Sequence, residues 1–338
     1  MKNALMLVGT YPWINVGDYI QAIAASQFFD HVDMYIEREH LNSYKGEPVN
    51  MIMNGWFMHH PENWPPSNFI HPLFVAFHIN SSVEESMLSD ESIAYLKLHE
   101  PIGCRDIYTL NLLRSKGVDA YFSACLTLTL GMKYNWQGQR EGKCYFVDPY
   151  VGNTQSRKWL LKSTLYTLFN YSSVCQQAKK MYGGKRAFRN ILKAAGFLWI
   201  NNKVFSKDLI DNASYACHWI ENDSLYPSDL DKITHAESLI KEYAKASLVI
   251  TSRIHCALPC LGLDTPVLYL HNLNLIKDSY CRLEGLIELL TVINCDNNVL
   301  IPQFELNGKI NLSTKIENKK SAKRYIRELI NTCKKWTS

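Results

Sequence analysis

The 338-residue sequence has ten cysteines but none of the arrangements that usually give cysteine a structural role. It contains no CxxC pair, and the cysteines do not alternate with histidines. A secreted chain of this length normally organises its cysteines into a disulfide framework, and a zinc site clusters its ligands. We therefore expect reduced thiols in a cytoplasmic protein, and nothing in the sequence calls for a metal or a cofactor.

Long apolar runs are also missing. The amino-terminal segment holds an apolar run of only about six residues that ends at Gly9, too short for a signal peptide or a membrane span. It predicts a first strand instead. Hydrophobic residues make up 47% of the chain and charged residues 20%, so a packed globular protein with room for two domains is expected.

Residues 157–207 lack acidic side chains altogether, because they carry eleven basic residues and no Asp or Glu. Aromatic residues are interleaved with these cations, a pattern typical of a segment that binds a membrane surface. We predict that Lys179, Lys180, Lys185 and Arg186 contact anionic lipid. A pair of solvated helices is the alternative, and no recognised nucleic-acid-binding motif accompanies the charge.

Short apolar runs alternate with helical patterns along most of the chain, which indicates βαβ units and a mostly parallel sheet. We predict an α/β protein with two Rossmann-like domains that face each other across a cleft, the glycosyltransferase-B arrangement. The domains are expected over residues 1–140 and 141–312, with residues 157–207 as an insertion and a helix in residues 313–338 that folds back. The predicted strands comprise residues 4–8, 49–53, 73–79, 101–104, 120–123, 144–147, 215–219, 248–251 and 266–270.

The strongest functional signal lies in residues 247–270. A predicted buried strand brings Ser252, Arg253 and His255 to its carboxyl end, where the amides and the positive end of the next helix attract anions. Arg253 can bind a phosphate or carboxylate through two hydrogen bonds, and His255 can carry a proton near neutral pH. The alternative is an Arg–His pair that only ties a loop.

The sequence YAKASLVITSRIHCALPCLGLDTPV in this region resembles the characteristic segment of the polysaccharide pyruvyl transferase family. In that family an Arg-x-His pair on the second domain contacts phosphoenolpyruvate, and Arg253 and His255 match the pair. Weaker likeness is found in residues 15–29, 54–67 and 102–130.

The resemblance implies transfer of pyruvate from phosphoenolpyruvate to two hydroxyls of a sugar as a ketal, with release of phosphate. A lipid-linked oligosaccharide at the cytoplasmic face of the membrane is the implied acceptor. Phosphoenolpyruvate carries a carboxylate and a phosphate, so at least two cationic donors are needed. We assign them to Arg253 and Arg105, with Ser252 and Ile254 beside them, and we expect His255 to be the acid that protonates the methylene carbon.

A carboxylate near this site is needed to accept the proton of the attacking hydroxyl. Asp18, in a turn directly after the first predicted strand, is our candidate. Asp106 is the alternative, but it can also serve only as the cap of the helix that follows it.

Aromatic and polar residues cluster after the second predicted strand, in a loop rich in proline. Aromatic faces stack on sugar rings, and amide and imidazole groups bond sugar hydroxyls. Loop tryptophans can equally pack on their own domain. The predicted acceptor-binding residues are Asn54, Trp56, His59, His60 and, at the end of the next strand, His78.

Two other functions compete with this interpretation. A nucleotide-sugar glycosyltransferase would share the fold, since fold alone does not fix the donor. It would need a carboxylate for the donor ribose and an apolar wall for the base, and neither is evident around Arg253. A non-catalytic sugar- or lipid-binding protein would leave the Arg–His pair without a purpose.

Overall fold

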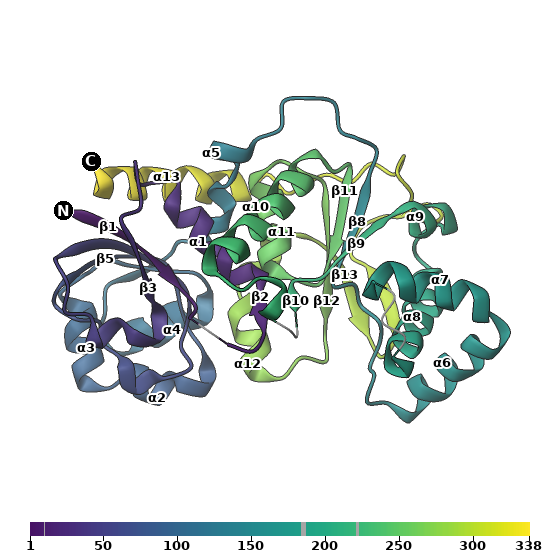
Figure 1. The fold of residues 1–338 in the computed structure, drawn as a ribbon, viewed down its shortest axis with the longest axis horizontal. Coiled ribbons are helices and arrows are strands. Elements are labelled where there is room, and N and C mark those ends of the chain that lie inside the picture. Colours follow the sequence, from purple (N-terminus) through teal and green to yellow (C-terminus); the bar gives the residue numbers. More distant parts are fainter. Residues whose placement is uncertain (10, 184–186, 221–222) are drawn as a thin grey trace.

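The computed structural model describes the chain except for residues 10, 184–186 and 221–222, and it contains two six-stranded sheets (Figure 1). The first sheet consists of β1 (Lys2–Leu7), β3 (Met34–Glu37), β4 (Val49–Phe57), β5 (Ile70–Ile79), β6 (Ile102–Cys104) and β7 (Ala120–Phe122). Its order is β3–β1–β4–β5–β6–β7, and all neighbouring strands are parallel. The predicted α/β class with parallel sheets is therefore confirmed.

The second sheet consists of β8 (Cys144–Val147), β9 (Ser214–Ala216), β11 (Leu248–Thr251), β12 (Val267–Asn272), β13 (Thr291–Asp296) and β14 (Val299–Pro302). Its order is β14–β13–β12–β11–β8–β9, and β14 runs antiparallel to β13 while the other pairs are parallel.

A short antiparallel pair, β2 (Ile14–Asn15) with β10 (Trp219–Ile220), joins the two halves of the chain. The single strand predicted at residues 215–219 is therefore divided into β9 and β10. The break falls at His218, whose backbone amide donates a 3.0 Å hydrogen bond to the carboxylate of Asp148. The amide of His218 thus bonds a side chain at the point where the chain leaves the second sheet.

Helices cover both faces of each sheet (Figure 1). Between the sheets lie α1 (Val16–Ser26), α10 (Asp229–Lys245) and α11 (Ile254–Gly262). The outer face of the first sheet carries α2 (Glu84–Met87), α3 (Asp90–Lys97) and α4 (Ile107–Ser115). The outer face of the second carries α6 (Arg157–Phe169), α7 (Tyr171–Tyr182), α8 (Phe188–Asn201) and α9 (Lys207–Asn212). The remaining helices are α5 (Gly131–Tyr134), α12 (Lys277–Tyr280) and α13 (Ala322–Thr337), of which α13 packs near β5.

The hydrophobic core follows the alternation of side chains along the strands. Leu7 of β1 and Val249 of β11 both point into one core between the sheets, which α1, α10 and α11 fill. Ala4 of β1 and Ile250 of β11, on the opposite faces of these strands, point instead into the two outer cores. The two sheets thus share a central core, and the domain boundaries at residues 140 and 312 stay predictions.

Candidate functional site

Each sheet has one place where the strand order reverses, and open parallel sheets bind ligands outside the strand carboxyl ends at such a place. In the first sheet it lies between β1 and β4, and in the second between β8 and β11. Asp148 follows β8, while Ser252 and Arg253 follow β11. The predicted donor residues therefore lie where the topology favours a ligand.

Arg253 is held in place by Asp148. Its Nε donates a 2.7 Å hydrogen bond to Asp148 Oδ2, and Ser252 Oγ donates to the backbone oxygen of Asp148 at 2.6 Å. The Asp148 carboxylate also accepts hydrogen bonds from the thiol of Cys217 and the amide of His218. Burial alone would raise the pKa of Asp148, but these donors, Arg253 first among them, hold it below the ordinary value. Asp148 is therefore a charged anchor for Arg253.

His255 lies at the beginning of α11, buried against α1. A Cβ atom at Gly17 would lie 2.9 Å from His255 Cβ, so only glycine lets the two helices approach this closely. No described side chain caps α11, and its first amides, those of Ile254 and His255, have no partner within the helix. The Ile254 side chain itself is buried in the central core, so only its backbone amide could bind an anionic donor substrate.

The imidazole of His255 is in an electropositive environment. Burial lowers its pKa well below the ordinary value, and the positive charges of Arg105 and Arg282 lower it further. Its Nε2 is buried and has no hydrogen-bond partner in the described chain. A neutral imidazole with an unused nitrogen thus lies within the electrostatic influence of two arginines.

Arg105, at the end of β6, is 1% exposed, and none of its three guanidinium nitrogens makes a hydrogen bond to a described residue. The carboxylate of Asp106 is 3.5 Å from its Nε. Arg282, in the 3₁₀ turn η6 (Cys281–Leu283), has a pKa below its ordinary value because it is buried and Arg105 carries the same charge. Buried cations are normally well hydrogen-bonded, so Arg105, with the Asp106 carboxylate beside it but no hydrogen bond to a described residue, and the adjacent charge of Arg282 indicate a site for a further anion.

Asp18 borders this group of cations from the side of α1. Its carboxylate accepts hydrogen bonds from Asn15 Nδ2 at 3.0 Å and from Gln21 Nε2 at 3.1 Å. Burial raises its pKa, although the charges of Arg38, Arg282 and Arg105 act in the opposite direction. A carboxylate with a raised pKa is a better proton acceptor than an ordinary one near neutral pH.

His78 and Asp106 form a buried pair next to Arg105, and in the sheet His78 is the register partner of Trp56, another predicted acceptor residue. His78 Nδ1 lies 2.6 Å from Asp106 Oδ2, and both side chains are fully buried. Burial lowers the pKa of His78 to about 4, so the ring is neutral. Asp106 caps α4 by accepting a 2.9 Å hydrogen bond from the amide of Thr109. The capping role of Asp106 is therefore present in the structure.

The predicted acceptor residues lie at the switch point of the first sheet, but Asn54 and Trp56 belong to strand β4 and not to a loop, because β4 continues beyond them. Asn54 and Trp56 line a small hollow of about 20 Å³ together with Asp18. The guanidinium of Arg38 lies 5.0 Å from the centre of the Trp56 ring. The Asn54 amide donates to the backbone oxygen of Gln21 at 3.0 Å, which fixes the strand end against α1.

Aromatic rings from both halves of the chain meet beside these residues. His59 lies 4.5 Å from Trp56 and 5.1 Å from Tyr11, measured between ring centres. Trp13 stacks on Tyr11 at 4.8 Å and on Trp219 of β10 at 4.5 Å. His60 is directed to solvent, where it pairs with Glu62 at 3.0 Å.

A family model for polysaccharide pyruvyl transferase matches residues 15–274. The chain belongs to the polysaccharide pyruvyl transferase family. Such an enzyme is a transferase that moves pyruvate onto a polysaccharide. No curated protein matches the chain.

Most residues of this candidate site lie within the matched residues 15–274. Three residues of the site were not predicted from the sequence. Asp148 follows a predicted strand directly, and this position was the signal that could have revealed it. Arg38 and Arg282 lie in 3₁₀ segments, η1 (Arg38–Ser43) and η6, for which the sequence has no comparable pattern. Arg282 also lies after residue 274, where the family match ends.

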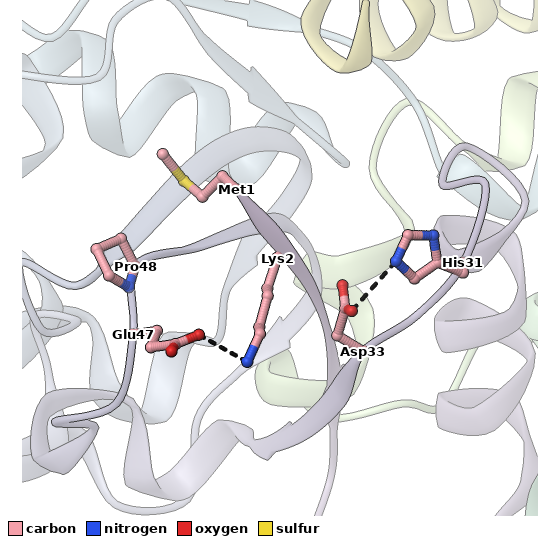
Figure 2. A pocket seen from close by; sticks show the side chains of 6 residues that line it. All are labelled: Met1, Lys2, His31, Asp33, Glu47 and Pro48. Atoms are coloured by element: carbon pink, nitrogen blue, oxygen red, sulfur yellow. Dashed lines mark hydrogen bonds and ion pairs between the residues drawn. The ribbon is translucent and has the colours of Figure 1, made fainter.

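A hollow of about 560 Å³ lies at the opposite edge of the first sheet, lined by residues that precede or begin β1, β3 and β4 (Figure 2). Its side chains are paired with one another: Lys2 with Glu47 at 2.6 Å, and His31 with Asp33 at 3.1 Å. A hollow at the amino ends of the strands, with satisfied charges, is not where a pyruvyl transferase of this topology would bind its donor.

Of the predicted lipid-binding residues, Lys179 and Lys180 lie at the end of α7, while Lys185 and Arg186 lie outside the described residues. Lys180 Nζ donates a 2.6 Å hydrogen bond to the backbone oxygen of Asp211. Among the described helices of this pyruvyl transferase family member, none is long and apolar enough to cross a membrane. No group of three His, Cys, Asp or Glu residues in the described part could hold a metal ion.

Proposed function

We propose that the protein transfers pyruvate from phosphoenolpyruvate to two hydroxyls of a sugar, forming a ketal and releasing phosphate. The observation that carries this proposal is the buried guanidinium of Arg105, which makes no hydrogen bond to a described residue and whose charge, with that of Arg282, acts on His255. Phosphoenolpyruvate would supply the anionic oxygens that Arg105 lacks. Its binding would also be assisted by Arg253, by Ser252 and by the first amides of α11.

The chemistry begins with protonation of the donor. His255 delivers a proton to the methylene carbon, which becomes a methyl group, and C2 becomes electrophilic. One sugar hydroxyl attacks C2, the C2–O bond to phosphate breaks, and a second hydroxyl attacks to close the ketal. The two hydroxyls release two protons, of which one replaces the proton of His255 and the other leaves with phosphate or through Asp18.

Donor binding would adjust the acid for its task. In the ligand-free protein, Arg105 and Arg282 lower the pKa of His255. The negative charges of phosphoenolpyruvate would offset those of the arginines, so the pKa of His255 would rise when the donor binds. The acid would then be protonated only when there is a donor to protonate.

The acceptor would bind on the aromatic cluster of Trp56, His59, Tyr11, Trp13 and Trp219. The hollow beside Asp18 has room for about one water molecule, so the side chains around it must move to admit substrates. We propose that two Rossmann-like domains open and close a cleft here, as in glycosyltransferase-B enzymes. We also propose a lipid-linked oligosaccharide acceptor at the cytoplasmic face of the membrane, with no cofactor.

Thermal-shift measurements with phosphoenolpyruvate and a panel of nucleotide sugars test the donor. Stabilisation by phosphoenolpyruvate alone, followed by mass spectrometry that finds a pyruvate ketal on the sugar product, is the expected result. Stabilisation by a nucleotide sugar and not by phosphoenolpyruvate would instead identify a glycosyltransferase. Binding of sugars without turnover of either donor would identify a non-catalytic protein.

A further inference from the structure

Helix α6 presents a row of leucines to solvent. Leu161, Leu165 and Leu168 follow one another at spacings of four and three residues, so they lie on one face of the helix. They are 62%, 45% and 71% exposed. The opposite face, with Trp159 and Ser163, is buried against the second sheet's outer core and α8. A surface helix usually exposes polar residues, whereas the outer side of α6 exposes leucines.

The apolar surface continues past the end of α6. Phe169 is 84% exposed, and Tyr171, at the beginning of α7, is exposed as well. Single exposed apolar residues are ordinary, but a contiguous group of leucine and aromatic side chains marks a binding surface. We call this group, consisting of Leu161, Leu165, Leu168, Phe169 and Tyr171, the leucine face.

Cations occupy the first half of the helix that carries the leucine face, and the ammonium of Lys162 lies 5.3 Å from the centre of the Trp199 ring. Arg157, Lys158 and Lys162 on the same helix are all exposed. No acidic residue occurs anywhere in residues 157–207, so no carboxylate of this segment neutralises them. The helix also lies at the end of the molecule farthest from the first sheet, where it is accessible to a flat surface (Figure 1).

We propose that the leucine face of α6 inserts into the interfacial region of an anionic bilayer while Arg157, Lys158 and Lys162 contact the lipid headgroups. A polar face of cations with leucine and aromatic side chains between them is the composition of helices that lie in a membrane interface. This proposal places the membrane-binding surface on α6, whereas the sequence predicted it at the end of α7 and just after it. Lys180, which bonds the backbone of Asp211, serves the fold instead.

A lipid surface fits this face better than a second copy of the chain. In a symmetric dimer the same patch meets itself, so Arg157, Lys158 and Lys162 of both copies would be brought together without a carboxylate between them. Anionic headgroups attract the same cations. The proposed function enters this inference only as its purpose, because a lipid-linked acceptor would be presented at that surface.

Flotation with vesicles of phosphatidylcholine, with and without phosphatidylglycerol, tests the proposal. The wild-type protein is expected to bind the anionic vesicles, more weakly as salt rises. Combining Leu161→Gln, Leu165→Gln and Leu168→Gln should reduce binding by about tenfold or more at constant charge, since the apolar insertion is lost. The melting temperature should stay the same, because these side chains are exposed. A matched control removes three exposed leucines elsewhere, Leu98→Gln, Leu225→Gln and Leu230→Gln.

A second readout does not depend on loss of binding. After the wild-type spectrum is subtracted, the added emission of Leu165→Trp should shift to the blue with anionic vesicles, and that of Leu98→Trp should not. Equal vesicle binding by the wild type and the α6 triple variant would overturn the proposal. The proposal would also be overturned if the wild-type protein did not bind vesicles but formed a dimer, and the α6 triple variant were monomeric.

These outcomes are separable from those of the proposed enzyme activity. The α6 triple variant should retain turnover of phosphoenolpyruvate with a short water-soluble acceptor, because α6 carries none of the donor-site residues. A protein that binds vesicles through the leucine face but never turns over phosphoenolpyruvate would contradict the proposed function and leave the membrane proposal standing.

Discussion

Arg253 and Asp148 meet at the carboxyl ends of the neighbouring strands β11 and β8, with Nε of the arginine 2.7 Å from Oδ2 of the aspartate. The aspartate is itself fixed by Cys217 and His218, so the guanidinium has a defined orientation. This hydrogen bond uses Nε of Arg253, so the two Nη groups remain available to bind oxygens of the donor substrate. We therefore expect Asp148 to position Arg253 in the proposed donor site.

Replacing Asp148 by Asn tests this role. Asp148 has a φ of 41°, a left-handed conformation that Asn tolerates well, so the backbone should be preserved. We expect the apparent constant for phosphoenolpyruvate to rise about tenfold, the equivalent of about 1.4 kcal/mol, with a smaller change in turnover at saturation. Asp264→Asn is the control, because Asp264 also has a positive φ, of 55°, but is exposed and remote from the cluster. Equal donor constants in both variants would remove Asp148 from the role.

Arg105→Met should stabilise the ligand-free protein. The buried guanidinium makes no hydrogen bond to a described residue, and its neighbouring carboxylate, that of Asp106, is 3.5 Å away and lies closer to His78. Removal of the guanidinium therefore relieves a poorly compensated buried charge at little loss of volume. We expect a higher melting temperature together with loss of the stabilisation by phosphoenolpyruvate.

Arg140→Met is the contrast, because Arg140 bonds the backbone of Ala244, Ala246 and Asp264, and its loss should lower the melting temperature without affecting the donor. A destabilised Arg105→Met protein that still responds to phosphoenolpyruvate would contradict the assignment.

The sequence predicted those parts of the site that depend on local pattern. Arg253 and His255 follow a buried apolar run, and their place at a strand end and helix beginning could be inferred from that run. The influence of Arg105 and Arg282 on His255 could not be inferred from the sequence, because it depends on packing between segments far apart in the chain. Strands β3, β13 and β14 were also missed. β14 runs antiparallel at the sheet edge with exposed Val299 and Ile301, so it lacks the continuous buried run of the central strands.

Gly17→Ala tests whether the position of His255 controls turnover. The new Cβ would lie 2.9 Å from His255 Cβ and 3.1 Å from its Nδ1, so the imidazole must shift. We expect turnover to fall about tenfold or more with little change in the constant for phosphoenolpyruvate. Gly196→Ala creates a comparable clash, with Trp159 and the backbone oxygen of Val151, far from the site. It should lower the melting temperature while the folded enzyme keeps its turnover, and the same kinetic loss in both variants would point to general destabilisation.

His218 should make the stability of the protein sensitive to acid. Burial lowers its pKa to about 4 in the folded chain, whereas an unfolded histidine titrates near 6.5. Between these values the unfolded chain binds more protons, so the free energy of unfolding falls as the pH falls, by on the order of 3 kcal/mol over the whole interval.

The contribution of His218 is complete above pH 6.5 and is lost on acidification. His218→Gln removes the titration and can retain a hydrogen bond to the hydroxyl of Tyr243, which His218 Nε2 contacts at 2.9 Å. The fall in melting temperature between pH 7.5 and pH 5 should therefore be smaller in this variant than in the wild type. His31→Gln, at an exposed histidine, serves as the control and should leave the fall unchanged. If His218→Gln shows the full acid sensitivity of the wild type, the buried neutral histidine is not its source, and His78, whose pKa burial also lowers to about 4, becomes the residue to replace next.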